Sequence, residues 1–352
     1  MAFRNKNHLP TSVEVPGINE HPGFFKYIGK LGIGAFAAAN MVLPSSSPAV
    51  AAEVTSYVAS HDELQPETET FVSMSETLTV ANWNTFFGNM PENVRDSVMS
   101  LLRQKSIDVI GLEEVHNPET RRLLADSINC LLCDYAGYVE TSDFEGSSKA
   151  SLPFIWRKDV FDLESHGVRK VSDRVTGIDD DTGDNMSVSE KNLVYYVLVN
   201  KETGVRTRFL ITQTVADFER DGEDISQNGD RVKLYKGHIK MMKEFVKELN
   251  AKDNIPTVII ADLNVDANYD DGSVSYYPEA TAKEMGFVFA DGKLSRSDQK
   301  LGTHQDPESG KKRRIDHILV SDDGKYVPGA AYVHKDKMGS DHRPLITKLR
   351  VV

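Results

Sequence analysis

Short apolar runs of strand length recur between residues 77 and 352, and stripes with helical spacing lie between them. The runs, bounded by polar or turn residues, are typical of strands buried in a sheet. We expect strands at 78–84, 107–112, 154–156, 193–199, 209–215, 257–263 and 315–320. Apolar spacing predicts helices over 92–106 and along the stripe Leu234, His238, Met241, Phe245 and Leu249. This mixture predicts an α/β sandwich with helices outside packed sheets.

The first 76 residues follow another pattern. Lys26 and Lys30 precede a mostly apolar stretch at 31–43, and the small-residue triplet Ala49-Val50-Ala51 follows. A basic flank, a short apolar stretch and such a triplet are features of a secretory signal. We expect a targeting segment at 1–52, a polar linker at 53–76 and one globular domain at 77–352. This interpretation implies a secreted or periplasmic protein; the alternative is a cytoplasmic protein with an amphipathic start.

Composition excludes several classes of protein. The 352 residues include 41 basic and 53 acidic side chains, a formal charge of −12, and two cysteines. An acidic chain is poorly suited to hold nucleic acid by its own positive field, so a phosphate ester substrate would require a divalent metal to supply charge. No apolar run approaches 20 residues, which excludes a polytopic membrane protein. Two cysteines supply neither a disulfide framework nor a four-thiolate zinc site.

Candidate chemistry stands at the ends of the predicted strands. A single aspartate at a strand end is usually a cap or a turn residue. Several polar residues at such positions indicate a functional site. Carboxylate and amide oxygens suit Mg²⁺ or Mn²⁺, whereas zinc would require more histidine or thiolate ligands. The candidate residues are Asn84, Glu114, Asp262, Asn264, Asp316, Asp341 and His342.

Five short motifs in order resemble those of the endonuclease/exonuclease/phosphatase superfamily, which includes pancreatic-type deoxyribonucleases, neutral sphingomyelinases and inositol phosphatases. The resemblance covers nearly all of 77–352 and implies a four-layer α/β sandwich of two packed mixed β-sheets flanked by helices. The motifs are Trp83-Asn84, Leu112-Glu113-Glu114-Val115, Ala261-Asp262-Leu263-Asn264, Arg314-Ile315-Asp316-His317 and Ser340-Asp341-His342-Arg343-Pro344.

The resemblance implies a catalytic domain at 77–352 that hydrolyses phosphoesters with Mg²⁺ or Mn²⁺. Glu114 and Asp341 would hold the metal, which polarises a phosphoryl oxygen. Asn84 would lie beside the metal and contact the substrate, and Thr303 would add a second contact to the phosphate.

The resemblance also implies the catalytic roles. Asp262 would orient or deprotonate the attacking water, and Asn264 would position that water or bind the phosphate. His342 would face the scissile phosphate. Asp316 would bind the other ring nitrogen of His342, fix its tautomer and favour the protonated form.

One position departs from the family pattern. The family strand before the long helix usually ends in a His or Tyr that contacts phosphate, and here Val215 stands in that place. Gln213 or Thr214 would be the substitute donors, because a slip of one residue reverses which side chains face the site. We expect His238 to be a core-edge histidine on the helix stripe.

The substrate class has three interpretations. A nuclease acting on DNA or RNA is the first interpretation, because the basic run at 311–314 would flank the phosphate. A sphingomyelinase-type phospholipid phosphodiesterase is the alternative, with Phe86-Phe87 or Tyr276-Tyr277 dipping into a membrane surface. A noncatalytic binding descendant of the fold is the third. The sequence indicates no obligate protein partner, and it leaves DNA or RNA preference, endo or exo cutting and oligomeric state open.

Overall fold

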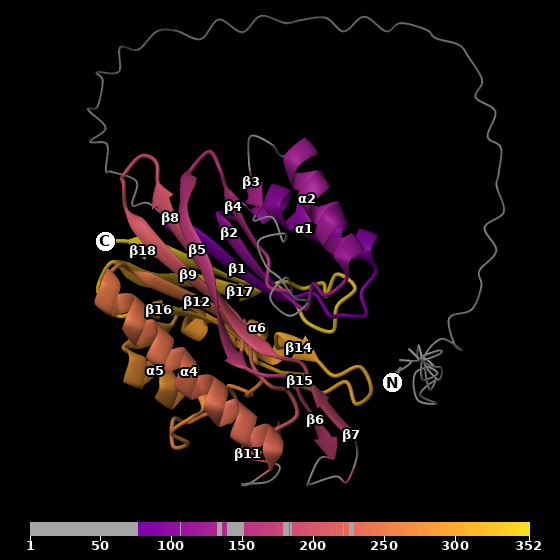
Figure 1. Cartoon of the computed structure of the whole chain (residues 1–352). Helices are drawn as coiled ribbons and strands as arrows, with labels where there is room; N and C mark the ends of the chain where they lie inside the picture. Colours follow the sequence, from indigo (N-terminus) through magenta and orange to yellow (C-terminus); the bar gives the residue numbers. More distant parts are fainter. Residues whose placement is uncertain are drawn as a thin grey trace, which may run out of the picture. The chain divides into compact units, whose positions relative to one another are not determined.

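Two six-stranded sheets form the centre of the described part of the protein (Figure 1). The structure is a computed structural model that describes residues 77–352 except 106, 132–135, 139–150, 179–182, 184, 221 and 225–228. The expected targeting segment and linker lie outside the described residues. The strand order of the first sheet is β17 (Tyr326–Val333), β18 (Leu345–Val351), β1 (Thr77–Asn84), β2 (Val109–Glu113), β4 (Phe154–Arg157) and β3 (Ala136–Tyr138). That of the second is β13 (Phe287–Phe289), β16 (Asp316–Ser321), β12 (Thr257–Asp262), β9 (Arg206–Gln213), β8 (Lys191–Asn200) and β5 (Phe161–Ser172).

Both sheets are mixed. β1 runs parallel to β2 and antiparallel to β18, while β12 runs parallel to β9 and antiparallel to β16. A strand that is covered on both faces needs apolar residues at successive positions. β12 is such a strand, because all six of its residues are buried.

Helices cover the outer face of each sheet and complete four layers (Figure 1). α1 (Pro91–Lys105) and α2 (Pro118–Leu131) pack on the first sheet, where Val98 and Trp83 belong to one core cluster. α4 (Asp230–Lys252) and α5 (Pro278–Met285) pack on the second, where Ile239 and Ile259 share another. A third cluster, which includes Phe154, fills the space between the sheets. The predicted four-layer α/β sandwich is confirmed.

The buried stripe of α4 is rotated relative to the prediction. His238, Phe245 and Leu249 are buried as expected, but Leu234 and Met241 are only partly buried. The remaining buried positions are Val232, Tyr235, Ile239, Met242 and Val246. Apolar residues stand on both sides of the expected stripe, so spacing alone does not decide which side faces the sheet.

The two sheets approach closely at Gly111 of β2. A Cβ atom added there would lie 2.8 Å from Ile260 Cγ2 of β12 and 3.2 Å from Ile211 Cδ1 of β9. Such distances leave no room for a methyl group without movement. The absence of a side chain at this position therefore brings the end of β2 close to the opposite sheet, three residues before Glu114.

Shorter elements surround the sheets. Within the described residues, no helix combines the length and apolar character needed to cross a membrane. The additional elements are the two-stranded pairs β6 (Val175–Ile178) with β7 (Asn185–Val188), β10 (Glu219–Arg220) with β11 (Glu223–Asp224), and β14 (His304–Gln305) with β15 (Lys312–Arg313), together with η4 (Ala290–Lys293) and α6 (Arg296–Leu301).

Candidate active site

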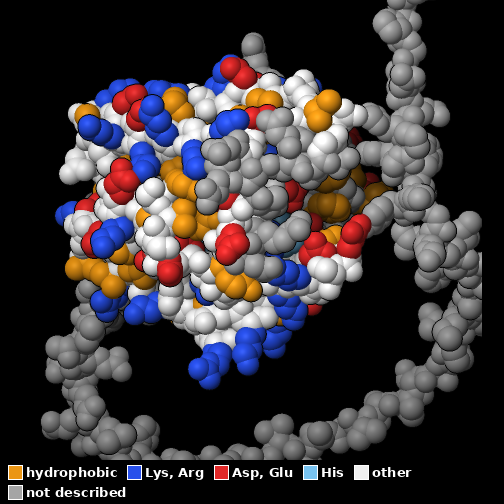
Figure 2. All heavy atoms as spheres, turned by 90° about the horizontal axis from the view of Figure 1, so that it is seen from below, with side chains coloured by type: hydrophobic (Ala, Val, Ile, Leu, Met, Phe, Trp, Pro, Cys, Tyr) orange, Lys and Arg blue, Asp and Glu red, His pale blue; other side chains and the backbone are white. Residues whose placement is uncertain are grey.

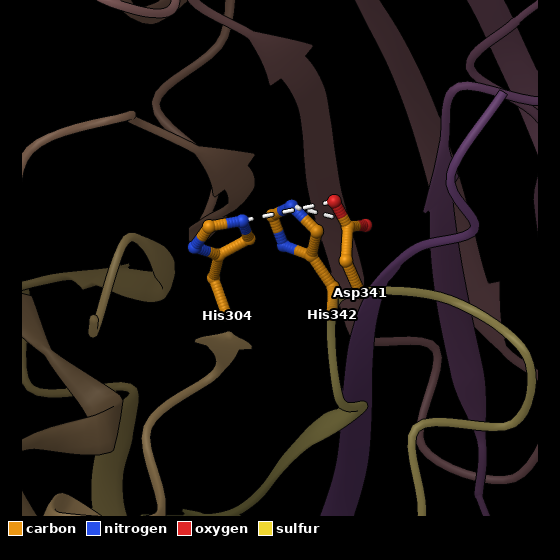
Figure 3. Close-up of side chains that lie close together, drawn as sticks. All are labelled: His304, Asp341 and His342. Carbon is orange, nitrogen blue, oxygen red and sulfur yellow. Dashed lines mark ion pairs between the residues drawn. The ribbon is translucent and has the colours of Figure 1, made fainter. Parts of the chain in front are cut away.

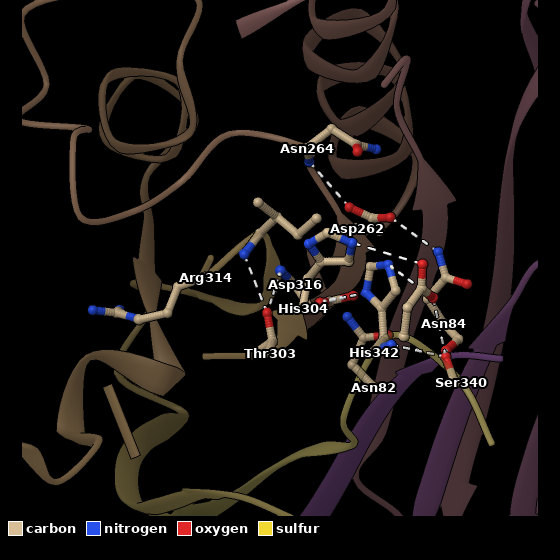
Figure 4. Close-up of polar contacts among 12 residues, drawn as sticks. Asn82, Asn84, Asp262, Asn264, Thr303, His304, Arg314, Asp316, Ser340 and His342 are labelled. Atoms are coloured by element: carbon tan, nitrogen blue, oxygen red, sulfur yellow. Dashed lines mark hydrogen bonds and ion pairs between the residues drawn. The ribbon is translucent and has the colours of Figure 1, made fainter. Parts of the chain in front are cut away.

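The carboxyl ends of β1, β2, β9 and β12 meet at one end of the sandwich, where most of the predicted site residues lie (Figure 4). The Nδ2 atom of Asn84, the last residue of β1, donates hydrogen bonds to Glu114 Oε1 at 3.1 Å and Asp262 Oδ2 at 3.0 Å. Glu114 follows a strand of the first sheet, and Asp262 ends a strand of the second. One amide thus joins carboxylates from the two sheets.

His342 and Asp316 form a buried pair beside these carboxylates. The Nδ1 atom of His342 lies 2.8 Å from Asp316 Oδ2, which leaves Nε2 facing the site. Burial alone would lower the pKa of His342, but the charge and hydrogen bond of Asp316, with Asp262 and Asp341, raise this pKa to about 10. The imidazole ring is therefore a cation at neutral pH.

Asp262 is a buried carboxyl group whose pKa is raised. Burial, followed by repulsion from Asp316, raises the pKa of Asp262 to about 6, while His342 and the hydrogen bond from Asn84 oppose this rise. A carboxylate whose pKa lies close to the working pH accepts a proton more readily than an ordinary surface aspartate. The position is suited to deprotonation of a water molecule.

Two site residues stand in left-handed backbone conformations just after their strands. Glu114 has a φ of 60° and Asn264 a φ of 54°. Asparagine tolerates this region, but a glutamate there is uncommon and costs on the order of 1–3 kcal/mol. The backbone N–H of Asn264 donates to Asp262 Oδ1 at 3.1 Å, and its side chain donates to Thr214 O at 3.4 Å. The turn at Asn264 thus brings its backbone N–H, and not its side-chain amide, to the Asp262 carboxylate.

The Ser340-Asp341-His342 segment is fixed to the end of β1. Ser340 Oγ donates to Asn84 O at 2.8 Å and accepts a hydrogen bond from the His342 N–H at 2.9 Å. Burial would raise the pKa of Asp341, but His304, whose Nε2 lies 3.7 Å from Oδ2, and the charge of His342 lower this pKa. Asp341 is therefore a carboxylate beside the imidazolium ring.

Thr303 lies behind the site and supports Asp316. Its side chain is buried, and its Oγ1 accepts hydrogen bonds from the backbone N–H groups of Ile315 at 3.1 Å and Asp316 at 3.2 Å (Figure 4). These contacts fix the start of β16. The phosphate contact expected of Thr303 stays a prediction.

Gln213, the last residue of β9, is the residue of this strand whose side chain contacts the carboxylates of the site. Its Nε2 donates to Glu114 Oε1 and lies 3.5 Å from Asp262 Oδ2. Val215 is instead buried in a small apolar cluster with Met186 and Val188 of β7.

His238 lies away from the catalytic carboxylates, as expected for a core-edge histidine. It is fully buried, with Nε2 2.9 Å from Thr212 Oγ1. Burial, followed by the charge of Lys191, lowers the pKa of His238 to about 3, so the ring is neutral.

His304 is a site residue that the sequence analysis missed. Its Nε2 lies 3.7 Å from Asp341 Oδ2, and its ring centroid is 4.7 Å from that of His342 (Figure 3). The available signal was its position directly after Thr303. The pairing of β14 with β15, and the bridge from His304 to His342, bring it to the site.

The basic run is partly neutralised. Arg313 Nη2 lies 2.6 Å from Glu219 Oε2, and Arg314 Nη2 lies 3.8 Å from Asp291 Oδ2. Lys311 lies over the ring of Tyr269 at 5.9 Å. Arg313 and Arg314 thus pair with acids of the same chain.

The two aromatic pairs proposed for membrane contact differ in exposure. Tyr277 is buried, and the Tyr276 and Tyr277 hydroxyls both donate to Asp224. Phe87 is 62% exposed, and its backbone N–H donates to Glu114 Oε2 at 3.0 Å. The backbone of an exposed aromatic residue therefore contacts a carboxylate of the candidate site.

The donor set fits a hard divalent cation. Nitrogen or oxygen atoms of Asp262, Asp316 and His342 lie within 4.8 Å of one another, as do those of His304, Asp341 and His342, and among these the carboxylates are the groups suited to a hard cation. Glu114 adds a further oxygen donor held by the Asn84 amide. Several carboxylates thus converge with one imidazolium ring between them, and a divalent cation with oxygen ligands would balance this excess of negative charge.

Comparisons with known proteins agree with this geometry. A sequence profile of the Endonuclease/Exonuclease/phosphatase family matches residues 81–342. No curated protein sequence matches the chain.

Solved structures share the fold at low sequence identity. An endonuclease/exonuclease/phosphatase family protein from Bacteroides thetaiotaomicron is 20% identical, with a TM-score of 0.56 over 79% of this chain and 98% of that one. A mannosyl-6-phosphatase from the same organism is 20% identical, with a TM-score of 0.51 over 77% and 99%. D. rerio TDP2 complexed with a single-strand DNA product is 14% identical, with a TM-score of 0.51 over 78% and 99%.

The family profile spans most of the chain, and its match ends at His342. Members of this family hydrolyse phosphoester bonds and are generally dependent on a divalent metal. The chain belongs to the endonuclease/exonuclease/phosphatase family.

Proposed function

We propose that this protein is a Mg²⁺- or Mn²⁺-dependent phosphodiesterase that acts as a nuclease on DNA or RNA. The observation that carries the proposal is the convergence of Asn84, Glu114 and Asp262 with the His342–Asp316 pair. Carboxylates for a metal, a buried base and an imidazolium ring are what the in-line hydrolysis of a phosphodiester requires.

Glu114 and Asp341 would hold the metal, with Asn84 beside them. A bound Mg²⁺ or Mn²⁺ would polarise a phosphoryl oxygen and offset the negative charge that grows in the transition state. Asp262 orients the attacking water and accepts its proton, while the Asn264 backbone N–H holds Oδ1 of that carboxylate.

His342 would donate a hydrogen bond from Nε2 to a phosphoryl oxygen. The partner of its Nδ1, Asp316, keeps the ring charged, and a charged donor binds a phosphate more strongly than a neutral one. The support from Thr303 fixes Asp316, so this histidine needs little reorganisation during the reaction.

A nucleic acid substrate is favoured by the basic residues beside the site. Lys312 is exposed on β15, which pairs with the strand that carries His304. Basic side chains elsewhere are spread among acidic ones over the face seen in Figure 2. TDP2, which shares the fold, has been solved with a single-strand DNA product. A short strand held near β15 is more compatible with this charge pattern than a long duplex track.

A phospholipid phosphodiesterase is the second candidate, and it rests on the exposed apolar residues near Glu114. Phe87 is 62% exposed and Met90 is 61% exposed. Two apolar side chains beside the carboxylates would enter the interface of a lipid surface and bring a headgroup to the site.

The test is a substrate panel with and without metal. Single-stranded DNA, duplex DNA, RNA and sphingomyelin vesicles are each incubated with Mg²⁺, with Mn²⁺ and with EDTA. We expect metal-dependent cleavage of nucleic acid, and we expect Asp262→Asn and His342→Gln each to lower kcat by about 10²–10⁴-fold.

Matched substitutions away from the site serve as controls. Asp162→Asn removes a 72% exposed carboxylate, and His166→Gln alters a histidine in the middle of β5. Both should keep the wild-type rate. Cleavage of sphingomyelin alone would favour the second candidate, and no metal-dependent turnover on any phosphoester would favour a noncatalytic descendant.

A further inference from the structure

Two amides, one from each sheet, hold the same two carboxylate oxygens. Asn84 Nδ2 of β1 donates to Glu114 Oε1 and Asp262 Oδ2 at 3.1 and 3.0 Å. Gln213 Nε2 of β9 donates to the same Glu114 oxygen and lies 3.5 Å from the same Asp262 oxygen. The two carboxylates, which repel each other in a buried site, are thus held by two neutral donors.

This arrangement depends on which way the Gln213 amide faces. An amide presents N–H donors on one side and a carbonyl acceptor on the other. Rotation by half a turn would direct Oε1 at Glu114 and Asp262, and oxygen would then face carboxylate oxygen. The two carboxylates only accept hydrogen bonds and so favour Nε2 on their side, and a partner that donates to Oε1 and accepts no hydrogen bond would hold the amide more firmly.

Lys191 is that partner. Its Nζ donates to Gln213 Oε1 at 3.4 Å, and an ammonium group has no acceptor atom, so it favours only the observed amide orientation. Lys191 begins β8, the strand that pairs with β9 in the second sheet. The carboxylates of Glu114 and Asp262 also attract the positive charge of Lys191.

We infer that Lys191 and Gln213 form a positioning pair for the metal ligand Glu114 and the neighbouring base Asp262. Lys191 fixes the Gln213 amide, and the oriented amide holds Glu114 in place for a divalent cation beside Asp262. The inference rests on the proposed metal-dependent function. It also accounts for the departure at Val215: β9 ends two residues earlier, at Gln213, and serves this site with a neutral amide.

The competing explanation is that Lys191 acts directly on the substrate phosphate. The two explanations differ in whether the effect of Lys191 requires the Gln213 amide. A lysine that acts through the amide loses its effect once the amide is gone, whereas a lysine that binds phosphate keeps it. A double-mutant cycle separates them.

The experiment measures Mn²⁺ binding to the full chain by calorimetry, without substrate. The variants are Gln213→Met, which keeps length but removes the amide, Lys191→Met, and the double substitution. Loss of a partner that orients a metal ligand costs about 10–100-fold in affinity. We expect each single substitution to weaken Mn²⁺ binding within that range, and the double variant to be no weaker than Gln213→Met.

Two further variants complete the design. Lys191→Arg keeps a charged donor without an acceptor and should restore most of the Mn²⁺ affinity. Lys170→Met removes an exposed lysine of β5, paired with Asp173, and should leave binding unchanged. Near-ultraviolet circular dichroism reports whether each variant is folded, and Gln213→Asn, which keeps a shorter amide, replaces Gln213→Met if the latter is unfolded.

The outcomes are distinct. Additive losses in the cycle, or Mn²⁺ affinity that is unchanged in Lys191→Met, would overturn the positioning pair while leaving metal-dependent catalysis intact. A wild-type protein that binds no Mn²⁺ and hydrolyses no phosphoester would instead overturn the proposed function itself.

Discussion

His342 is charged because a carboxylate is buried against it. Asp316 Oδ2 lies 2.8 Å from Nδ1, and the pair is shielded from water by the surrounding sheets. The pKa of about 10 lies above the ordinary value of 6.5, so the folded protein binds this proton more tightly than the unfolded chain. The resulting stabilisation is fully present below pH 6.5 and is lost as the pH rises through about 10.

We therefore expect the His342 ring of metal-free protein to remain protonated between pH 6.5 and about 10 in a histidine NMR titration. Asp316→Asn removes the main source of the raised pKa and should move the midpoint downward. The matched control is Asp291→Asn, because Asp291 pairs in the same way with His317 at 3.2 Å. A wild-type His342 that titrates near 6.5 would contradict the interpretation.

The residues named by sequence motifs were easier to predict than those supplied by register. Asn84, Asp262 and His342 stand in short motifs whose order carries the information. Gln213 was named only as one of two substitutes for Val215, and His304 was missed, because both reach the site through the pairing of β9 with β12 and of β14 with β15. Pairing between distant strands is a property of the folded sheets, which local pattern does not specify.

At the scale of elements, the distance between the sheets depends on Gly111. The absence of a side chain lets β2 approach Ile260 and Ile211 of the opposite sheet. Glu114 follows β2, and Asp262 ends the strand that carries Ile260. Spacing of the carboxylates is therefore linked to packing in the core.

Gly111→Ala should destabilise the protein by about 1–3 kcal/mol, because the added methyl group overpacks the space between the sheets. It should also weaken Mn²⁺ binding, since β2 moves away from β12. The control is Gly237→Ala on the exposed side of α4, where nothing lies within 4 Å of the added atom. That change should stabilise by about 0.5–1 kcal/mol. Denaturant unfolding measures both, and equal effects would refute the packing argument.

Central strands were predicted well, and edge strands were not. β12 and β9 are buried at successive positions because both faces are covered, and each contains a short apolar run. β5 and β17, at the edges of the two sheets, mix exposed and buried positions and were missed. β18 was also missed, although its neighbours cover it on both sides.

At the scale of the whole molecule, the net charge of −12 leads us to expect that binding of a divalent metal would stabilise the folded protein. Mn²⁺ that binds only the folded state should raise the free energy of unfolding by about 2.7 kcal/mol at a hundred times its Kd. Thermal unfolding with increasing Mn²⁺, and with EDTA, measures this. Glu114→Gln removes a predicted ligand and should lose most of the shift; an equal shift in this variant would argue against a site at Glu114.

The N-terminal 76 residues remain the basis of a proposal about location. We propose that residues 1–52 direct export and that 53–76 form a linker before the catalytic domain at 77–352. Expression in a secreting bacterial host should give an exported protein whose intact mass corresponds to cleavage after Ala51. Replacing Ala49 and Ala51 with bulky residues should block the cleavage. Full-length protein retained in the cytoplasm would favour the alternative.

The Asn84 amide bridges a glutamate beside one sheet and an aspartate of the other. Neither half of the sandwich holds a complete set of catalytic groups. A chain whose two sheets have not yet packed together would consequently lack the arrangement on which the proposed hydrolysis depends. We therefore expect any such activity to appear only once the two sheets have packed against each other.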